Sequence, residues 1–134
     1  MRWVLPVLIL VLAGCTPGME AYRSAQQSEA EAQSIVPQNY KLEIIALMRT
    51  YLNDPVGVRG AFASEPAMRT IDGTNRYTVC LRYNARKGPS QYAGSKDSIV
   101  LFRQGKLDRI VDNARELCKD AAYQPFPELE RMTR

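Results

Sequence analysis

The segment RYTVCLRYN, residues 76–84, decides the fold of this chain. Its side chains alternate between two sides of an extended strand. On one side lie Tyr77, Val79, Leu81 and Tyr83, and on the other Thr78, Cys80, Arg82 and Asn84. Aromatic and β-branched residues at a period of two are typical of a β-strand whose two faces meet different surroundings. We therefore expect a sheet built around this segment, with its more apolar face toward a core.

Three other segments have strand character: GVRGAFAS (57–64), SIVLFR (98–103) and LDRIV (107–111). The centre of SIVLFR is apolar on both faces, which is typical of an internal strand. Between the last two segments, Gln104-Gly105-Lys106 predicts a tight turn, because glycine readily adopts a positive φ.

Helical periodicity flanks the strands. Residues 39–55 carry an apolar stripe at helical spacing, with Asn39 as the expected N-cap and Asp54-Pro55 as the stop. We expect the Met and Tyr positions of this stripe to lie in the core. The stripe consists of Tyr40, Ile44, Leu47, Met48, Tyr51 and Leu52. A second helix is expected over 113–123, capped by Asp112. Its apolar side is Ala114, Leu117, Cys118 and Ala121.

This order of elements predicts an α+β fold: a helix, a three- to four-stranded antiparallel meander, and a C-terminal helix packed on the sheet. The 134 residues suffice for one domain. We place the globular part at residues 38–124 and expect a loose C-terminal tail over 125–134, since two prolines interrupt regular structure there. Residues 15–37 are rich in Ala, Gln, Ser and Glu and predict a tether or a solvated helix.

The first residues have the pattern of an export signal. The apolar run Trp3–Leu12 follows Arg2 and is ten residues long. A helix of that length rises about 15 Å, roughly half of a hydrocarbon core. The next residues, Leu12-Ala13-Gly14-Cys15, resemble the bacterial lipobox. The resemblance implies a lipoprotein signal peptide over 1–14 and a lipidated Cys15 at the start of the mature chain. The alternative is a plain signal peptide with an incidental cysteine.

The lipobox also implies a compartment. Thr16 follows the acylated cysteine, and in enterobacterial sorting an aspartate there retains a lipoprotein in the inner membrane. The resemblance therefore implies a protein anchored in the outer membrane and facing the periplasm, with the inner membrane as the alternative.

If Cys15 carries lipid, Cys80 and Cys118 are the two remaining cysteines. The periplasm is oxidising, so we expect them to form a disulfide. It would close a loop of about 39 residues, worth about 4 kcal/mol in the chain-entropy model. Two separate buried thiols are the alternative. Because Cys80 lies on the less apolar side of its strand, either the sheet is covered on both faces or the disulfide lies at an edge.

The sequence lacks the residues that several kinds of catalysis and ligand binding require. The chain contains no histidine, which removes the commonest acid/base at neutral pH and the commonest metal ligand. No Cys/His metal spacing and no glycine-rich phosphate loop occurs in the sequence. We therefore expect no cofactor and no metal.

Positive charge is concentrated in the predicted sheet. Residues 59–109 hold ten basic and four acidic residues, within a chain of net charge +4. The basic residues are Arg59, Arg69, Arg76, Arg82, Arg86, Lys87, Lys96, Arg103, Lys106 and Arg109. Such a surface suits an anionic envelope component or another envelope protein. The alternative is a solvated face whose arginines prevent unwanted strand pairing. An exported protein is not expected to bind nucleic acid.

The segment YNARKGPSQYAGSKD, residues 83–97, joins two predicted strands with more residues than a hairpin needs, so we expect a long loop. Over residues 40–103 the chain resembles a group of small exported bacterial proteins and lipoproteins with no established activity. The matching positions are Asp54, Pro55, Cys80, Asn84, Ala85, Tyr92 and Gly94. Ser90 and Gln91 stand where that group has a double glycine. The resemblance implies a fold and a compartment.

Within the expected loop, Arg86, Lys87 and Tyr92 are the candidate partner-binding residues, two supplying charge and one a rigid amphipathic contact. Asn84 is expected to close the neck of the loop. Tyr92 could instead fold back onto Tyr83 or the sheet as a plug.

These features favour a lipid-anchored, non-enzymatic binding or assembly module of the cell envelope. One alternative is a small wall-active hydrolase using paired carboxylates, or Ser95 or Ser98 with Lys96. The available carboxylates are Glu65, Asp72 and Asp97. Another alternative is an anchored inhibitor of a host lysozyme, which is less favoured because lysozymes are themselves mostly basic.

Overall fold

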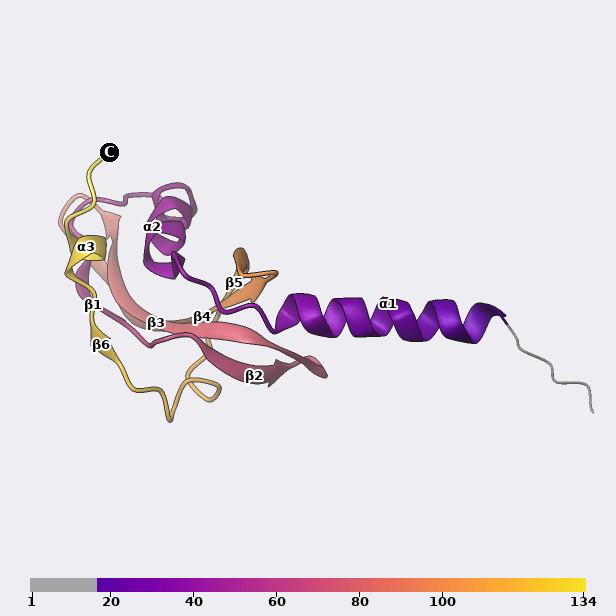
Figure 1. Ribbon diagram of the computed structural model, residues 1–134. Coiled ribbons are helices and arrows are strands. Elements are labelled where there is room, and N and C mark those ends of the chain that lie inside the picture. Colours follow the sequence, from indigo (N-terminus) through magenta and orange to yellow (C-terminus); the bar gives the residue numbers. More distant parts are fainter. Residues whose placement is uncertain (1–16) are drawn as a thin grey trace, which may run out of the picture.

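A computed structural model describes residues 17–134 of the chain (Figure 1). Two helices precede an antiparallel sheet, and a short helix lies near the C-terminus. The helices are α1 (Pro17–Gln33), α2 (Tyr40–Tyr51) and α3 (Pro127–Glu130). The strands are β1 (Arg59–Ala63), β2 (Ala67–Ile71), β3 (Thr74–Gly88), β4 (Gln91–Arg103), β5 (Lys106–Asp112) and β6 (Gln124–Pro125). The α+β class is confirmed, but the sheet has six strands rather than three or four.

Strand β3 is the centre of the sheet. Strand order is β5-β4-β3-β1-β6, and β2 pairs with β3 beyond the end of β1. Every pairing is antiparallel. The predicted turn between β4 and β5 is confirmed, with positive φ at Gln104 (53°) and Gly105 (72°). A second turn of this kind, with positive φ at Asp72 and Gly73, joins β2 to β3. The Asp-Gly pair is the sequence signal that would have revealed β2.

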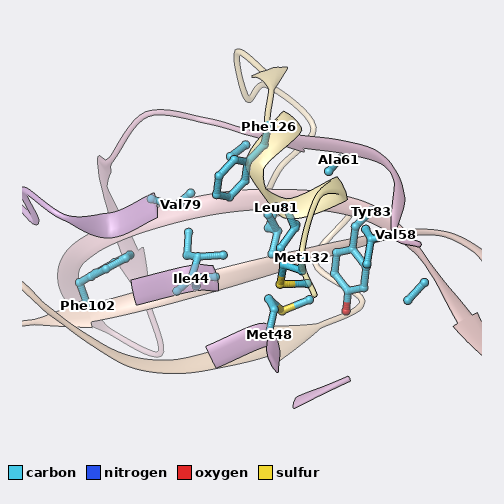
Figure 2. Close-up of a cluster of buried hydrophobic side chains, with 14 residues drawn as sticks. Ile44, Met48, Val58, Ala61, Val79, Leu81, Tyr83, Phe102, Phe126 and Met132 are labelled. Carbon is cyan, nitrogen blue, oxygen red and sulfur yellow. The ribbon is translucent and has the colours of Figure 1, made fainter. Parts of the chain in front are cut away.

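The sheet is covered on both faces, and the alternation in β3 explains why. Val79, Leu81 and Tyr83 belong to a large core against α2, α3 and the C-terminal segment (Figure 2). From α2, Ile44 and Met48 reach this core, and both are fully buried. Cys80 points to the opposite face, into a smaller cluster. The other buried members of that cluster are Ile71, Ile99, Leu101, Ala114 and Cys118.

The disulfide between Cys80 and Cys118 is present and links β3 to the segment that covers the second face. That segment, residues 113–123, was expected to be a helix, which is wrong: it is a series of turns. Asn113 has a positive φ of 58°, which breaks helical entry. The Arg69 guanidinium, on β2, also donates to the Leu117 carbonyl oxygen at 3.0 Å. This carbonyl therefore accepts a hydrogen bond from the sheet, whereas in a helix it would accept one from a backbone amide of the next turn.

The expectation of a loose tail over 125–134 is also wrong. Phe126, Leu129 and Met132 are buried in the main core. The Phe126 amide donates to the Ala61 carbonyl oxygen at 2.8 Å, and the Glu130 carboxylate accepts from the Ala61 amide at 2.9 Å. The apolar residues of this segment therefore complete the face of the sheet that α2 only partly covers.

Helix α2 confirms the helix expected after Asn39, although Asn39 makes no side-chain capping hydrogen bond. Met48 lies in the core as expected, whereas Tyr51 at the end of the helix is 40% exposed. The Tyr51 ring therefore lies outside the core that the apolar stripe predicted for it.

Helix α1 extends away from the sheet (Figure 1), which confirms the solvated-helix reading for residues 17–33. Only its C-terminal end is held. Arg103 of β4 forms an ion pair with Glu29 at 2.8 Å, and the Gln104 amide donates to the Ala32 carbonyl oxygen at 3.0 Å. Ile35 lies so close to Gly105 that a Cβ there would be 2.7 Å from its Cγ2. Within residues 17–134, no helix combines the length and apolar character needed to cross a bilayer.

Candidate binding groove beside the hairpin of β3 and β4

The segment expected to be a long loop is a β-hairpin. Strands β3 and β4 stay paired out to Gly88 and Gln91, so the expected loop over 83–97 is wrong. Register shifts between Asn84 and Gly88 absorb the extra residues as bulges. The Asn84 Oδ1 accepts a hydrogen bond from the Gly94 amide at 2.9 Å, across the first bulge. Asn84 thus holds the two strands together where their ladder is interrupted.

Tyr92 is a structural plug on this hairpin, though not against Tyr83. Its hydroxyl donates to the Gly57 carbonyl oxygen at 2.8 Å. The guanidinium of Arg59 stacks 4.2 Å from the centre of its ring. Arg86 packs beside it, so close to Gly57 that a Cβ there would be 2.7 Å from the Arg86 Nε. Tyr92 therefore connects β4 to the loop before β1.

Most of the positive charge predicted for the sheet is neutralised by ion pairs. Seven of the ten basic residues between 59 and 109 lie within 4.0 Å of a carboxylate. Arg59 stacks on Tyr92, and Arg69 donates to a backbone carbonyl. Of these ten side chains, all of which the structure describes, only Lys87 has neither an ion pair, a hydrogen bond nor an aromatic partner.

A groove of about 260 Å³ lies between the end of α2 and the hairpin. Three basic residues line it, Arg86, Lys87 and Lys96, and the described residues contribute no carboxylate to its lining. The other lining residues are Tyr51, Leu52, Asn53, Tyr83, Ala85, Ala93 and Gly94. Two candidate residues from the sequence, Arg86 and Lys87, thus meet a third cation, Lys96.

The groove residues Tyr51 and Lys96 also contact Asp112, the last residue of β5. The Asp112 carboxylate accepts from the Tyr51 hydroxyl at 2.6 Å, from the Ser98 hydroxyl at 2.8 Å and from the Lys96 amine at 3.4 Å. Burial acts to raise the pKa of Asp112, but these hydrogen bonds and the Lys96 charge more than offset it, so the pKa lies below its usual range. The hydrogen bond to Asp112 also raises the pKa of Tyr51 far above its ordinary value.

Tyr83, another residue of the groove, has an unsatisfied hydroxyl. In Figure 2 its ring extends from β3 to the level of Met48 on α2. The side chain is 2% exposed, and its hydroxyl oxygen has no hydrogen-bond partner among residues 17–134. Burial raises the pKa of Tyr83, so the hydroxyl stays protonated and is a hydrogen-bond donor.

Four of the residues considered for hydrolysis, Asp72, Lys96, Asp97 and Ser98, make other side-chain contacts. Ser98 is fully buried and donates to Asp112, and Ser95 and Lys96 are neighbours on one strand, so their side chains point to opposite faces. Asp97 is paired with Arg82 at 2.6 Å, and Asp72 with Arg109 at 3.7 Å. In the described part of the chain, no three His, Cys, Asp or Glu residues form a group that could hold a metal ion.

The sequence did not point to Tyr51, Tyr83 or Lys96 as groove residues. Tyr51 and Tyr83 were assigned to apolar faces, and no local signal shows that the end of α2 meets the hairpin. Cys15 and the lipobox lie outside the described residues.

No family model, curated protein or solved structure matches this chain.

Proposed function

We propose that this protein is a lipid-anchored protein of the cell envelope that acts as a non-enzymatic binding or assembly module. The lipobox ending in Cys15 supports anchoring, with the outer membrane facing the periplasm as the proposed site and the inner membrane as the alternative. The groove between α2 and the hairpin is its proposed binding face, and its partner is an anionic envelope component or another envelope protein.

The observation that carries this proposal is the groove lined by Arg86, Lys87 and Lys96 with no carboxylate among its described lining residues. Cations gathered on a concave surface attract an anionic partner and orient it. Lys87 carries most of this argument, because its charge is paired with no other group among the described residues.

Helix α1 supports the proposed display of this face. It begins at Pro17, two positions after the proposed anchor Cys15, and its other end is fixed to β4 and the β4–β5 turn by Glu29 and Ala32. A helix of 17 residues is about 25 Å long. The acylated end would therefore be separated from the sheet by a stiff spacer, which limits how the groove can be turned relative to the membrane.

The alternative of a wall hydrolase receives less support. The buried Ser98 hydroxyl donates to Asp112, and the Lys96 amine contacts the same carboxylate. These contacts join β4 to β5 and hold the Asp112 carboxylate that accepts from Tyr51 of α2, which is a structural role.

Fractionation tests the anchoring. The wild-type protein is expected in the membrane fraction, and Cys15→Ala is expected to be soluble or unprocessed because it lacks the acylated thiol. Ser24→Ala serves as the control, since Ser24 is exposed on α1 and lies outside the lipobox. Equal membrane association and equal mobility of the Cys15→Ala protein and the wild type would overturn the proposal.

A further inference from the structure

We infer that the groove between α2 and the hairpin is a binding site for a phosphate group. This inference rests on the proposed function, because it names the ligand chemistry of the proposed binding face. It starts from three basic residues that line one groove, Arg86, Lys87 and Lys96, which come from both strands of the hairpin.

Lys87 and Lys96 favour phosphate over carboxylate as the anionic group. A carboxylate is recognised best by the planar fork of an arginine, which donates two parallel hydrogen bonds. The only arginine of the groove, Arg86, already donates to the Tyr92 hydroxyl at 3.5 Å and lies 4.0 Å from the Asp54 carboxylate. Lysines bind phosphate as point charges from several directions, and this is the arrangement that the groove offers.

Lys87 is the cation most available to a ligand. It is exposed, and no acid or aromatic ring of the described chain contacts it. Lys96 is shared, since its amine lies 3.4 Å from the Asp112 carboxylate, which Tyr51 and Ser98 also hold. Lys96 can therefore turn toward a bound anion while two hydroxyl donors continue to satisfy Asp112.

The Tyr83 hydroxyl is a second observation that agrees with this site. It belongs to a residue that lines the groove, it is buried, and among the described residues no acceptor lies within hydrogen-bond distance, Ser98 being the neighbouring hydroxyl. Buried hydroxyls are nearly always paired, so an unpaired donor beside a set of cations indicates a site for an acceptor with negative charge.

The size of the groove limits the ligand. Sites for whole drug-sized ligands occupy roughly 300–1,000 Å³, and this groove of about 260 Å³ is smaller. It fits a phosphate group with a short substituent, such as the headgroup of a lipid or a small soluble phosphate ester. Both sources share one chemistry, and the experiment must separate them.

The test uses the full chain in nonionic detergent micelles, titrated with inorganic phosphate and followed by the backbone amide signals of residues 86–96 in NMR spectra. We expect saturable shifts of these signals. Lys87→Gln should weaken phosphate binding on the order of tenfold, since it removes one charge-assisted contact. Lys119→Gln is the matched control, because Lys119 is an exposed lysine outside the groove, and it should bind phosphate like the wild type.

Two further titrations complete the design. Glycerol 3-phosphate and phosphatidylglycerol doped into the micelles separate a soluble ester from a lipid headgroup; binding of either, with the same loss in Lys87→Gln, supports the site and identifies its source. Acetate tests the choice of anion. No saturable shift with any phosphate probe, an equal loss in Lys119→Gln, or tighter binding of acetate than of phosphate would each overturn the inference. These results concern binding by the purified protein, so they are independent of the Cys15→Ala fractionation.

Discussion

The hydroxyl of Tyr51, the last residue of α2, donates to the carboxylate of Asp112, the last residue of β5, at 2.6 Å. This contact joins two elements that are 61 positions apart in the chain. It fixes the end of α2 beside the hairpin of β3 and β4, and so fixes one wall of the groove.

Removing the Tyr51 hydroxyl should weaken this connection. Tyr51→Phe is expected to lower the free energy of unfolding by about 1 kcal/mol, a small value for a bond to a charged group because the pair is partly exposed to solvent. Urea denaturation measures the change. Tyr22→Phe is the matched control, since Tyr22 is exposed on α1 and its hydroxyl makes no hydrogen bond with the described residues. Equal stability of the two variants would contradict a stabilising role for the Tyr51 contact.

The pair of Asp97 and Arg82 should make stability depend on pH. Two hydrogen bonds from the guanidinium, at 2.6 and 3.1 Å, hold the pKa of Asp97 below its ordinary value. A depressed carboxyl pKa stabilises the fold above the ordinary Asp pKa, and the stabilisation is lost as pH falls through the folded-state pKa. The free energy of unfolding should therefore fall as pH is lowered below about 4.

Asp97→Asn should remove part of this pH dependence and cost about 1.5 kcal/mol at pH 7. Denaturation curves collected at several pH values measure both effects. Asp120→Asn is the control, because the Asp120 carboxylate is exposed and forms no ion pair with the described residues. The slope of the unfolding free energy against pH should be shallower for Asp97→Asn than for Asp120→Asn. If the two slopes were equally steep, Asp97 would not contribute to the pH dependence of stability.

The disulfide should supply a large share of the stability. Cys80 and Cys118 are separated by 38 positions, for which the chain-entropy model gives about 4 kcal/mol. The double variant Cys80→Ala/Cys118→Ala should lose about that much, and a reducing agent should destabilise the wild type but leave the double variant unchanged. A wild-type protein whose melting temperature does not respond to the reducing agent, with reduction verified by mass, would rule this out.

Tyr92 should behave as a structural residue. Tyr92→Ala loses the hydrogen bond to Gly57 and the ring under Arg59, and should cost about 2–3 kcal/mol of unfolding free energy. Tyr92→Phe should cost about 1 kcal/mol, because only the hydroxyl is lost. Lys87→Ala is the comparison within the same hairpin and should stay within about 0.5 kcal/mol of the wild type. If Tyr92→Ala were as stable as Lys87→Ala, Tyr92 would be free to serve as a recognition residue instead.

The sequence by itself determined the features that depend on local periodicity. The alternation in residues 76–84 assigned Val79 and Leu81 to one face and Cys80 to the other, because successive side chains of a strand point to opposite sides. The apolar stripe after Asn39 determined α2 in the same way. The Cys80–Cys118 pairing was expected because these two cysteines remain once Cys15 is assigned to lipidation, in an expected oxidising compartment.

Only the tertiary structure decided which parts of the chain meet. The segment 113–123 has a helical pattern, yet the positive φ of Asn113 and the contacts of Leu117 and Cys118 with the sheet hold it as turns. Local propensity is weaker than such contacts. The C-terminal residues Phe126 and Leu129 are likewise ordered by a sheet face that lies far from them in sequence.

The distribution of charge shows most clearly which properties the sequence determines and which the tertiary structure decides. Counting residues predicted a strongly basic sheet, but ion pairs between elements distant in sequence neutralise seven of its ten basic side chains. A sequence fixes the number of charges, whereas the distance between two charges depends on the fold, and the energy of the pair depends on that distance. The fold therefore decided that Lys87, among these ten side chains, is the one with no ion pair, hydrogen bond or aromatic partner among the described residues.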